Sequence, residues 1–332
     1  MGRPTSRRTF ALGLGLVPVA ASLPVRAQDW KPAKPITILI GLSPGGPTDI
    51  IARLLAAHMQ EVLKVSVIVE SKPGAGQAIA IQSMKARPAD GTTLFLGTGG
   101  ALSLAPAVRK DLAYQPMQDL AFVSMVALQP GVIVVPASSS IPDGHGLIRY
   151  AKANPGKLNY GSQGIGSSGH MAMEYVLTRT GTTMNHVPFK GDSEILREML
   201  GDRIDVAIMS TGAAVPHARN GGLRILCTTS TGRLSSFPDL PSLSDVGLDA
   251  LTGLDPFTYF AMVAKAGTPD EVVAVLNRGI NAALAVPSIA EQLRKVVLVE
   301  PANSTPEGLL KLVKEDTAKW SEIATRSKIE IN

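Results

Sequence analysis

The feature that most constrains the fold is an alternation of strand and helix patterns that begins at residue 36. Runs of β-branched and other apolar residues, as in strands buried on both faces, alternate with segments whose apolar residues recur at helical spacing. The strand-like runs are ITILIG, VSVIVES and TTLFLGT, and the helical segments between them are TDIIARLLAAHMQEVL and AIAIQSMKA. This order predicts an α/β fold with mixed, mostly parallel sheets and helices on both faces of each sheet.

The same pattern restarts after Gln129–Pro130, which predicts a second α/β unit. Its strand-like runs are GVIVVPA, KLNYGS, IDVAIMS and LRILCTTS. A polar, Pro-rich stretch at 231–247 predicts a long surface loop, and TYFAMVAK then begins a return segment. Two units followed by a return segment predict two lobes joined by chain crossings. We expect lobe 1 to contain residues 28–128 plus 254–332 and lobe 2 to contain residues 129–253.

Composition and charge exclude several classes of partner. Hydrophobic residues make up 45% of the chain and charged residues 18%, which is a globular composition. The formal net charge is +5, but four arginines lie in the first 27 residues without any acid, so the remainder carries 5 − 4 = +1. A nearly neutral surface does not attract DNA. The aromatic content of 4% also argues against sugar-binding and single-strand nucleic-acid sites, so we expect no nucleic-acid partner.

The N-terminal segment predicts export. SRRTFALGLGLVPVAASLPVRAQ combines a basic head, an apolar stretch and a small-residue cleavage site. We therefore expect a signal peptide over residues 1–27, cleaved after about Ala27, and a mature protein in the periplasm. The pair Arg7–Arg8 favours the twin-arginine route, and an ordinary signal that carries two arginines is the alternative. The only cysteine, Cys227, lies in an apolar run that predicts burial, and it leaves no internal disulfide.

Three glycine-rich turns share one chemistry. GLSPGGPTD (41–49), GTGGALS (97–103) and GSQGIGSSGH (161–170) each follow a predicted strand and precede a predicted helix. Turns of this kind lie at the carboxyl ends of strands, where open α/β sheets bind their ligands. Glycine lets backbone N–H groups approach a ligand, and the following helix adds unpaired N–H groups and the positive end of its dipole. Several such turns predict a cradle for an anion, most simply a carboxylate.

The third turn also matches the dinucleotide fingerprint G-x-G-x-x-G at Gly164, Gly166 and Gly169. That motif normally follows the first strand of its unit and precedes an acidic residue about 20 positions later. Here it comes well into the second unit, and Asp192 follows VPFKG rather than ending an apolar strand. We therefore do not expect a dehydrogenase, and we expect no cofactor.

Candidate catalytic groups do not form a recognisable set. An exported serine hydrolase that uses Ser167 or Ser168 with His170 is the alternative function, but no G-x-S-x-G elbow is present, and the histidines lack metal-ligand spacing. Asp49 is expected to cap the first helix, or to act on a ligand by fixing its loop or through ordered water. Lys190 has two equally plausible roles, as the partner of an anion or as a solvated loop residue.

A series of segments resembles one family, the Bug (TctC-type) solute-binding receptors of tripartite tricarboxylate transporters. The segments follow the family's order over nearly the whole mature chain: KPITILIGLSPGGPTDIIARLLA, VIVESKPGAGQ, ADGTTLFLGT, AKANPGKLNYGSQGIGSSGHMAMEYV, HVPFKG, LGDRIDVAI and VAKAGTPDEVVAVLN. The resemblance implies a two-lobed periplasmic-binding-protein type II (Venus-flytrap) fold. It also implies a receptor, not an enzyme, that closes on a small carboxylate and delivers it to membrane subunits of such a transporter. We expect the receptor to be a monomer and to hold no metal.

The resemblance further implies which residues contact the ligand. In the family, the loop that corresponds to residues 44–49 holds a ligand carboxylate, partly through waters, and loops of the other lobe lie opposite. The positions carried over to this chain are Pro44, Gly45, Gly46, Thr48, Asp49, Gly76, Thr98, Ser162, Gly166, Ser167, Ser168, Phe189, Lys190, Ser210 and Tyr259.

Three positions depart from the family's pattern. Leu42 stands where the family commonly has an aromatic residue, Met209–Ser210 stands where it often has Asp–Asn, and Ala105 stands where it usually has Asn. Without an acid at position 209, an obvious partner for an ammonium group is missing, so we predict that the ligand is not an amino acid. Leu42 and Met209 have two alternative roles, as contacts to an apolar part of the ligand or as packing residues.

Overall fold

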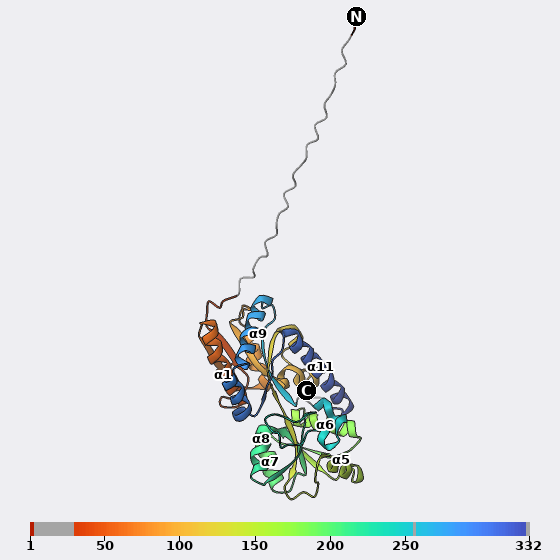
Figure 1. The fold of residues 1–332 in the computed structure, drawn as a ribbon. Helices are drawn as coiled ribbons and strands as arrows, with labels where there is room; N and C mark the ends of the chain where they lie inside the picture. Colours follow the sequence, from red (N-terminus) through yellow and green to blue (C-terminus); the bar gives the residue numbers. More distant parts are fainter. Residues whose placement is uncertain (3–29, 255–256, 330–332) are drawn as a thin grey trace.

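The computed structural model describes residues 1–2, 30–254 and 257–329, and the predicted signal peptide lies outside this part of the chain apart from its first two residues. The described chain forms two β-sheets, each with helices packed against it (Figure 1). The first sheet has six strands in the order β11-β4-β10-β3-β1-β2, and the second has five in the order β7-β6-β8-β5-β9.

The first sheet and its helices make up lobe 1. Its strands are β1 (Ile36–Ile40), β2 (Val67–Ser71), β3 (Thr93–Thr98), β4 (Leu120–Gln129), β10 (Thr258–Lys265) and β11 (Glu300–Pro301). Its helical segments are α1 (Pro47–Leu63), η1 (Ala75–Gln77), α2 (Ala78–Lys85), η2 (Gly100–Leu104), α3 (Ala105–Val108), α4 (Pro116–Asp119), α9 (Asp270–Leu284), α10 (Pro287–Gln292), η5 (Leu293–Val297) and α11 (Pro306–Arg326).

The second sheet and its helices make up lobe 2. Its strands are β5 (Gly131–Pro136), β6 (Asn159–Ser162), β7 (Asn185–Pro188), β8 (Val206–Ser210) and β9 (Leu223–Thr228). Its helical segments are α5 (Gly144–Ala153), α6 (Ser168–Thr180), α7 (Asp192–Leu200), α8 (Thr211–Arg219), η3 (Ser244–Val246) and η4 (Asp249–Leu254).

Strand β1 shows why the apolar runs form buried strands. All five of its residues are buried, and they face two different hydrophobic cores. Ile36, Ile38 and Ile40 belong to the core that includes residues of α1 and α9, whereas Leu39 points to the core on the opposite face. A strand covered on both faces has no reason to alternate apolar and polar residues, so the run is continuously apolar.

The predicted α/β architecture with two mixed sheets is confirmed. β1 pairs parallel with β2 and β3, and β6 pairs parallel with β7 and β8, while β4, β5 and β10 make antiparallel pairs. Parallel pairing therefore does not predominate as the sequence predicted. The reason is that β4, β5 and β10 lie next to the chain crossings and enter their sheets against the direction of the neighbouring strands.

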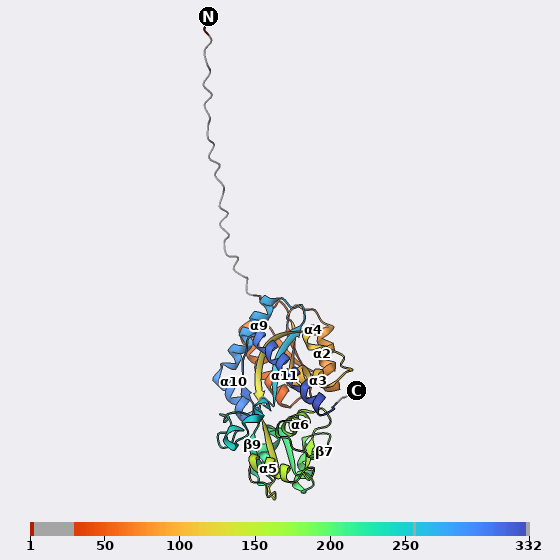
Figure 2. The ribbon, with the colours of Figure 1, turned by 90° about the vertical axis from the view of Figure 1, so that its right-hand side faces the viewer.

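The two lobes are joined where the chain passes directly from β4 through Pro130 into β5, and again where it returns to β10 (Figure 2). Polar contacts link the lobes near these crossings. Thr211 Oγ1 donates to the carbonyl of Leu298, 3.1 Å away. The Glu300 carboxylate accepts from the Ser236 backbone N–H at 3.0 Å, which ties the long loop of lobe 2 to β11.

Helix α11 crosses the boundary between the lobes. Leu309 and Val313 in its first half lie in a core of lobe 1, whereas Trp320, Ile323 and Ala324 lie in the core of lobe 2. Figure 1 shows the helix running beside lobe 1 towards α6, and α11 contacts α3, β4 and α6. One rigid helix is thus buried in both lobes at once.

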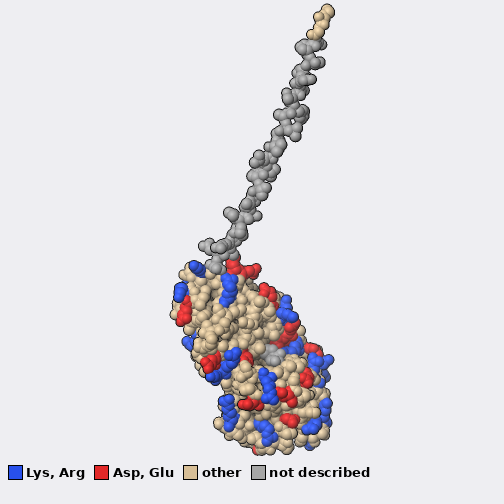
Figure 3. All heavy atoms as spheres, in the orientation of Figure 1, with Lys and Arg blue, Asp and Glu red and all other residues tan. Residues whose placement is uncertain are grey.

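The surface shows mixed charge. Lys and Arg side chains are interspersed with Asp and Glu over the face in Figure 3, without a large area of one sign. By length and hydropathy, no single helix in the described chain qualifies as a membrane span, although α9 and the α10–η5 segment qualify together as a pair bent by 71°.

Truncating Trp320 tests the role of α11. Its side chain is 3% exposed within the lobe 2 core, so Trp320→Ala is expected to lower the free energy of unfolding by about 3–5 kcal/mol. Lys311→Ala on the exposed side of the same helix is the control and is expected to change it by less than about 0.5 kcal/mol. Denaturant unfolding measures both. A loss below about 1 kcal/mol for Trp320→Ala would show that α11 does not hold the lobe 2 core.

Cys227 gives a second test of the packing. The predicted burial is confirmed, and burial, helped by Asp143, raises the pKa of its thiol to about 12. Because the thiolate is the reactive form, native protein at pH 8 is expected not to react with a disulfide reagent such as DTNB, and urea-unfolded protein is expected to react fully. Rapid labelling of the native protein would contradict the described packing around Cys227.

Candidate functional site

Three loops of lobe 1 meet at the carboxyl ends of β1, β2 and β3. Gln77, in the loop after β2, joins them: its Nε2 donates to Thr98 Oγ1 at the end of β3, 2.6 Å away. The same side chain packs against Gly41 at the end of β1, where a Cβ atom would lie 2.5 Å from Gln77 Cβ. Gly41 is therefore required by close packing, and the predicted positions Gly76 and Thr98 lie beside the 41–49 loop.

Asp49 fixes the first of these loops. Its Oδ2 accepts from the Gly45 backbone N–H at 3.0 Å and from Arg53 Nε at 3.0 Å. The hydrogen bond from Arg53 is the main reason that the pKa of the Asp49 carboxyl is lowered, and burial opposes it. Asp49 was expected as the helix cap, which is wrong: the N-cap of α1 is Gly46, and Asp49 lies in the first turn. The Gly45 bond shows that Asp49 holds its loop, and the expected action on a ligand through this loop stays a prediction.

Buried polar atoms without partners cluster at this edge of lobe 1. They are Thr48 Oγ1, Asp49 Oδ1 and Gln77 Oε1, which are all buried and make no hydrogen bond within the described part of the chain. Most buried polar atoms in proteins are paired, so a group of unpaired ones marks a place where a ligand or ordered water binds. The two acceptors, Asp49 Oδ1 and Gln77 Oε1, require a donor from whatever binds there.

The loops of lobe 2 also share one edge. β6, β7 and β8 are parallel, so the loops that follow Ser162, Pro188 and Ser210 leave the sheet on the same side. The Phe189 N–H donates to the Ser162 carbonyl at 2.9 Å and ties two of these loops together. The N-termini of α6 and α8 begin here, and both supply N–H groups and positive dipole ends that favour an anion.

Two predicted serines serve as helix caps at this edge. Ser167 Oγ accepts from the His170 backbone N–H at 3.3 Å, and Ser210 Oγ accepts from the Ala213 backbone N–H at 3.3 Å. Each hydroxyl keeps its own O–H as a donor that it can turn towards a bound group. The caps therefore fix the loops without removing the serines as ligand donors.

Two stacked histidines lie directly behind the 162–168 loop. The His170 and His186 rings stack with centroids 3.9 Å apart and 10° between their planes. His186 Nε2 lies 2.6 Å from Ser162 Oγ, and His170 Nδ1 accepts from the Gly166 backbone N–H at 3.0 Å. Burial and the neighbouring His186 lower the pKa of His170 to about 4. Burial also lowers the pKa of His186.

Strand register places the two loop edges opposite each other. Thr98 at the end of β3 is paired with Phe260 of β10, and Thr258 of the same strand is paired with Gln129 at the end of β4. Two residues further along the chain, Gly131 is paired with Ser210 at the end of β8. Both carboxyl edges therefore flank the same crossing, so the glycine-rich turns of the two lobes face the boundary between them.

The remaining predicted residues divide by exposure. The exposed ones are Pro44, Gly45, Gly76 and Lys190. The half-buried ones are Gly46, Thr98, Gly166, Ser167, Ser168, Phe189 and Ser210, and the buried ones are Thr48, Asp49, Ser162 and Tyr259. Tyr259 lies within a hydrophobic core, and its hydroxyl bonds to Ser103, so it supports the site from behind in this structure. Met209 is fully buried in a lobe 2 core, whereas Leu42 is 41% exposed in the 41–46 loop.

Two groups at these edges were not predicted from the sequence. Gln77 adopts a backbone φ of +78°, which is rare for a residue other than glycine, and His186 stacks on a ring 16 residues earlier in the chain. The only sequence signal for Gln77 is its place beside Gly76 in a strand-to-helix loop. No local signal distinguishes His186.

The structure argues against the two alternative sites. Asp192 does not end a strand but begins α7, where its Oδ1 accepts from Gln163 Nε2, and burial raises its pKa. It is thus placed to hold the loop, not a ribose. As for a hydrolase, the His170 ring accepts from the Gly166 N–H and contacts Ser167 only through its backbone.

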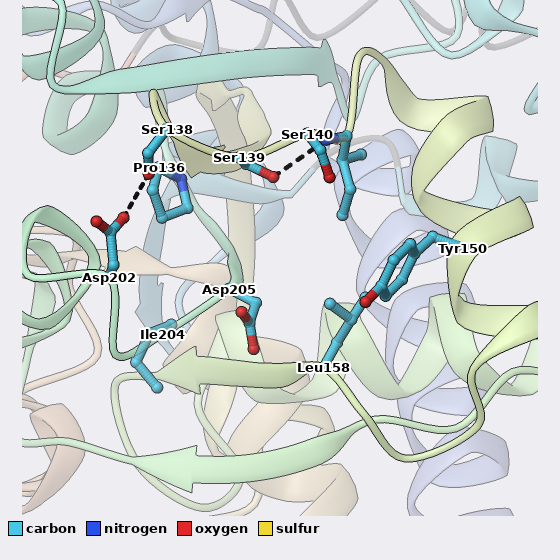
Figure 4. Close-up of a pocket in the computed structure, with 10 residues that line it drawn as sticks. Pro136, Ser138, Ser139, Ser140, Tyr150, Leu158, Asp202, Ile204 and Asp205 are labelled. Atoms are coloured by element: carbon cyan, nitrogen blue, oxygen red, sulfur yellow. Dashed lines mark hydrogen bonds between the residues drawn. The ribbon is translucent and has the colours of Figure 1, made fainter.

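A separate cavity of about 240 Å³ lies at the opposite edge of the lobe 2 sheet (Figure 4). Ser138, Ser139, Tyr150, Asp202 and Asp205 are among its lining residues. Ser138 donates to Asp202, and Asp205 accepts from the Asn159 N–H at 2.7 Å. Two carboxylates at one opening repel an anion, so this cavity does not suit a carboxylate ligand.

Comparisons with known proteins identify related sequences and structures. The family described as Tripartite tricarboxylate transporter family receptor matches residues 51–329. Protein BugT of Bordetella pertussis (strain Tohama I) is 30% identical over 319 residues, which cover 96% of this chain and 96% of BugT.

Two solved structures share the fold and carry a ligand in their descriptions. Rpa4515 of R. palustris with adipate is 29% identical, covers 90% of this chain and 99% of that chain, and has a TM-score of 0.74. MatC from Rhodopseudomonas palustris with bound malate is 25% identical, covers 88% and 99%, and has a TM-score of 0.68.

The Asp49 contacts predict a pH-dependent contribution to stability. Asp49→Asn keeps the shape but removes the charge, and it is expected to cost about 1.5–3 kcal/mol at pH 7 because the carboxylate accepts two hydrogen bonds. The pKa of Asp49 is lowered in the folded state, so this stability is present above the unfolded value of about 3.9 and is lost as the pH falls below it. Wild type and variant should therefore converge near pH 2.

Urea unfolding at pH 7 and at low pH measures this difference. Arg53→Gln is the comparison variant, which removes only one of the two hydrogen bonds, and it should cost less than Asp49→Asn because the Arg53 side chain is 60% exposed. Equal stability of wild type and Asp49→Asn at pH 7 would show that the charge of Asp49 does not stabilise the folded state.

Proposed function

The chain belongs to the tripartite tricarboxylate transporter receptor family, and we propose that it captures a small carboxylate between its two lobes for such a transporter. The observation that carries this proposal is the placement of glycine-rich turns and helix N-termini at two sheet edges that flank one crossing. The family name supports the membrane subunits of a tripartite transporter as partners. The two relatives whose structures are described with adipate and malate support a dicarboxylate as the ligand.

In this proposal the carboxylate is neutralised mainly by lobe 2. The unpaired N–H groups at the starts of α6 and α8 point along positive helix ends, and hydrogen bonds to a charged acceptor are roughly twice as strong as neutral ones. Lys190 is exposed beside the same edge and adds a full positive charge. Lobe 1 contributes backbone N–H groups of the 44–49 loop together with the unpaired acceptors Asp49 Oδ1 and Gln77 Oε1.

The unpaired acceptors of lobe 1 indicate which groups the ligand carries besides its carboxylate. Acceptors in lobe 1 are satisfied by a hydroxyl group of the ligand or by water that donates to them. The remaining proposed contacts are the predicted positions Pro44, Gly45, Gly46, Thr48, Gly76, Thr98, Ser162, Gly166, Ser167, Ser168, Phe189 and Ser210, with Tyr259 behind them. We keep the proposal that the ligand is not an amino acid, because no acid stands at position 209.

The proposal also covers the state and location of the protein. We propose that residues 1–27 are removed on export to the periplasm, that residues 28–128 plus 254–332 and residues 129–253 move as two bodies, and that the receptor is monomeric and performs no reaction. Closure of two bodies on a ligand presents a new surface to a membrane partner.

Ligand-dependent stabilisation tests this function. A ligand that binds only the folded state raises the free energy of unfolding by about 2.7 kcal/mol at 100 times its dissociation constant. Adipate, malate and other di- and tricarboxylates are therefore expected to raise the melting temperature, and calorimetric titration then gives the affinity. Aspartate and glutamate are expected not to bind. Failure of every acid to stabilise the protein would contradict the receptor proposal.

A pair of lysine variants sharpens the same test. Lys190→Ala is expected to weaken binding of the best acid at least about tenfold, the effect of losing one charge-assisted contact. Lys152→Ala, an exposed lysine on α5, is the matched control and should leave the affinity unchanged. Equal affinity in both variants would remove Lys190 from the proposed site.

A further inference from the structure

The 162–168 loop depends on one buried side chain. His170 is 4% exposed, and its Nδ1 accepts the Gly166 backbone N–H at 3.0 Å, in the middle of the loop. Its own backbone N–H donates to Ser167 Oγ, so the residue holds the loop from both its ring and its main chain. Gly166 has a φ of +72°, a left-handed conformation that glycine adopts without strain, so the loop turns here and brings the Gly166 N–H to the ring.

A second imidazole completes the support. His186 on β7 stacks against His170 at 3.9 Å, and its Nε2 lies 2.6 Å from Ser162 Oγ at the start of the loop. Tyr160 on β6 stacks on His186 with ring centroids 4.8 Å apart. Both ends of the turn are therefore bonded to one stack of rings that comes from three elements.

The titratable groups that face His170 are His186, Glu174 and Tyr160. Glu174 Oε1 lies 4.0 Å from His170 Nε2, and the same oxygen accepts from the Tyr160 hydroxyl at 2.6 Å. Its charge favours a protonated His170, whereas burial and the second imidazole disfavour it, and the latter two dominate. The ring is thus neutral at pH 7.

The bond to Gly166 constrains the protonation state. A backbone N–H is a donor, so His170 Nδ1 must be unprotonated, and the single ring proton of the neutral form lies on Nε2, towards Glu174. Protonation at Nδ1 would set a donor against the Gly166 N–H and a positive charge 3.9 Å from the second ring. Loop order and neutrality of His170 are therefore coupled.

We infer that His170 is a positioning residue that, stacked on His186, holds the 162–168 loop in its ligand-binding shape only while the ring is neutral, so that acid loosens this loop. The inference deepens the proposed function, since it concerns the same loop as the proposed ligand site. A histidine freed from the stack titrates near its ordinary value of about 6.5, against about 4 in the folded loop. The open form of the loop therefore gains on the ordered form by about 80-fold between pH 6.5 and pH 4.

The protection of the Gly166 amide against hydrogen exchange measures this effect without any ligand. In the wild type its protection factor, corrected for the intrinsic exchange rate, is expected to fall steeply between pH 6.5 and pH 4, by up to about 80-fold. His170→Asn places an amide oxygen near the position of Nδ1, so it is expected to keep the protection at pH 7 and to give a shallower pH profile than the wild type, in which only His186 still titrates. His170→Leu lacks an acceptor and is expected to lose the protection at every pH.

Two further measurements separate positioning from simple packing. Nitrogen-15 NMR of the histidine rings should show His170 as the Nε2–H tautomer at pH 7. His145→Asn, an exposed histidine on α5, is the control and should keep the wild-type pH profile. A wild-type profile that is flat, an Asn variant that titrates like the wild type, or an Nδ1–H tautomer would each overturn the inference, even if His170→Leu fails to fold.

Adipate serves as the probe of binding. If it binds the wild type, His170→Asn is expected to match the wild-type affinity at pH 7 within about twofold and to bind more tightly than the wild type near pH 4. Protonation of adipate itself affects both proteins equally and cancels in this ratio. If adipate does not bind the wild type, that result counts against the proposed function for this acid, while the amide protection and the ring tautomer still decide the inference.

Discussion

The whole site depends on antiparallel pairing at the chain crossing. β10 pairs with β3 and β4, and β4 continues through Pro130 into β5, which pairs with β8. These ladders orient both sheets so that the ends of their parallel strands meet at one boundary. Pro130 has no N–H to donate, so it suits the point where one ladder stops and the next begins. Without this crossing, the same helix N-termini would open to solvent on unrelated faces.

The two edges brought together in this way are chemically unequal. Lobe 2 presents two helix N-termini, serine hydroxyls, Lys190 and the unpaired oxygen of Gln163, whereas lobe 1 presents the N-terminus of α1, backbone donors and the unpaired oxygens of Asp49 and Gln77. Under the proposed function, an anion gains most from lobe 2 because two helix N-termini and Lys190 lie there, and lobe 1 contacts its polar substituents. A ligand that contacts both edges would then favour the proposed closed arrangement, and α11, buried in both lobes, would limit how far the lobes separate.

The sequence predicted what is local and missed what is not. Apolar runs and glycine turns identified strands such as β1 and the loops after β1, β3 and β6, because both signals arise within a few residues. The antiparallel returns were missed, since Thr98 and Phe260 are paired across more than 150 positions. The family resemblance pointed to Tyr259, but it could not show that its side chain packs into a hydrophobic core. The left-handed backbone of Gln77 could not be predicted, because nothing in the local sequence indicates it. Asp49 lies three residues after the cap position, because Gly46 is the N-cap and α1 begins at Pro47.

The glycine motif at 164–169 shows that a sequence pattern can indicate a backbone geometry without identifying a ligand. Gly164 and Gly166 have φ values of +111° and +72°, which the turn between β6 and α6 requires. At Gly169 a Cβ atom would lie 2.4 Å from Gln163 Oε1 and 2.7 Å from the Ile208 carbonyl, so packing alone demands glycine there. Backbone geometry or packing thus explains each of the three glycines without a bound phosphate. The motif forms a tight turn that leads into a helix whose first N–H groups are free. We infer that the surrounding groups, which here are serines, Lys190 and a neutral histidine stack, determine which anion binds to those N–H groups.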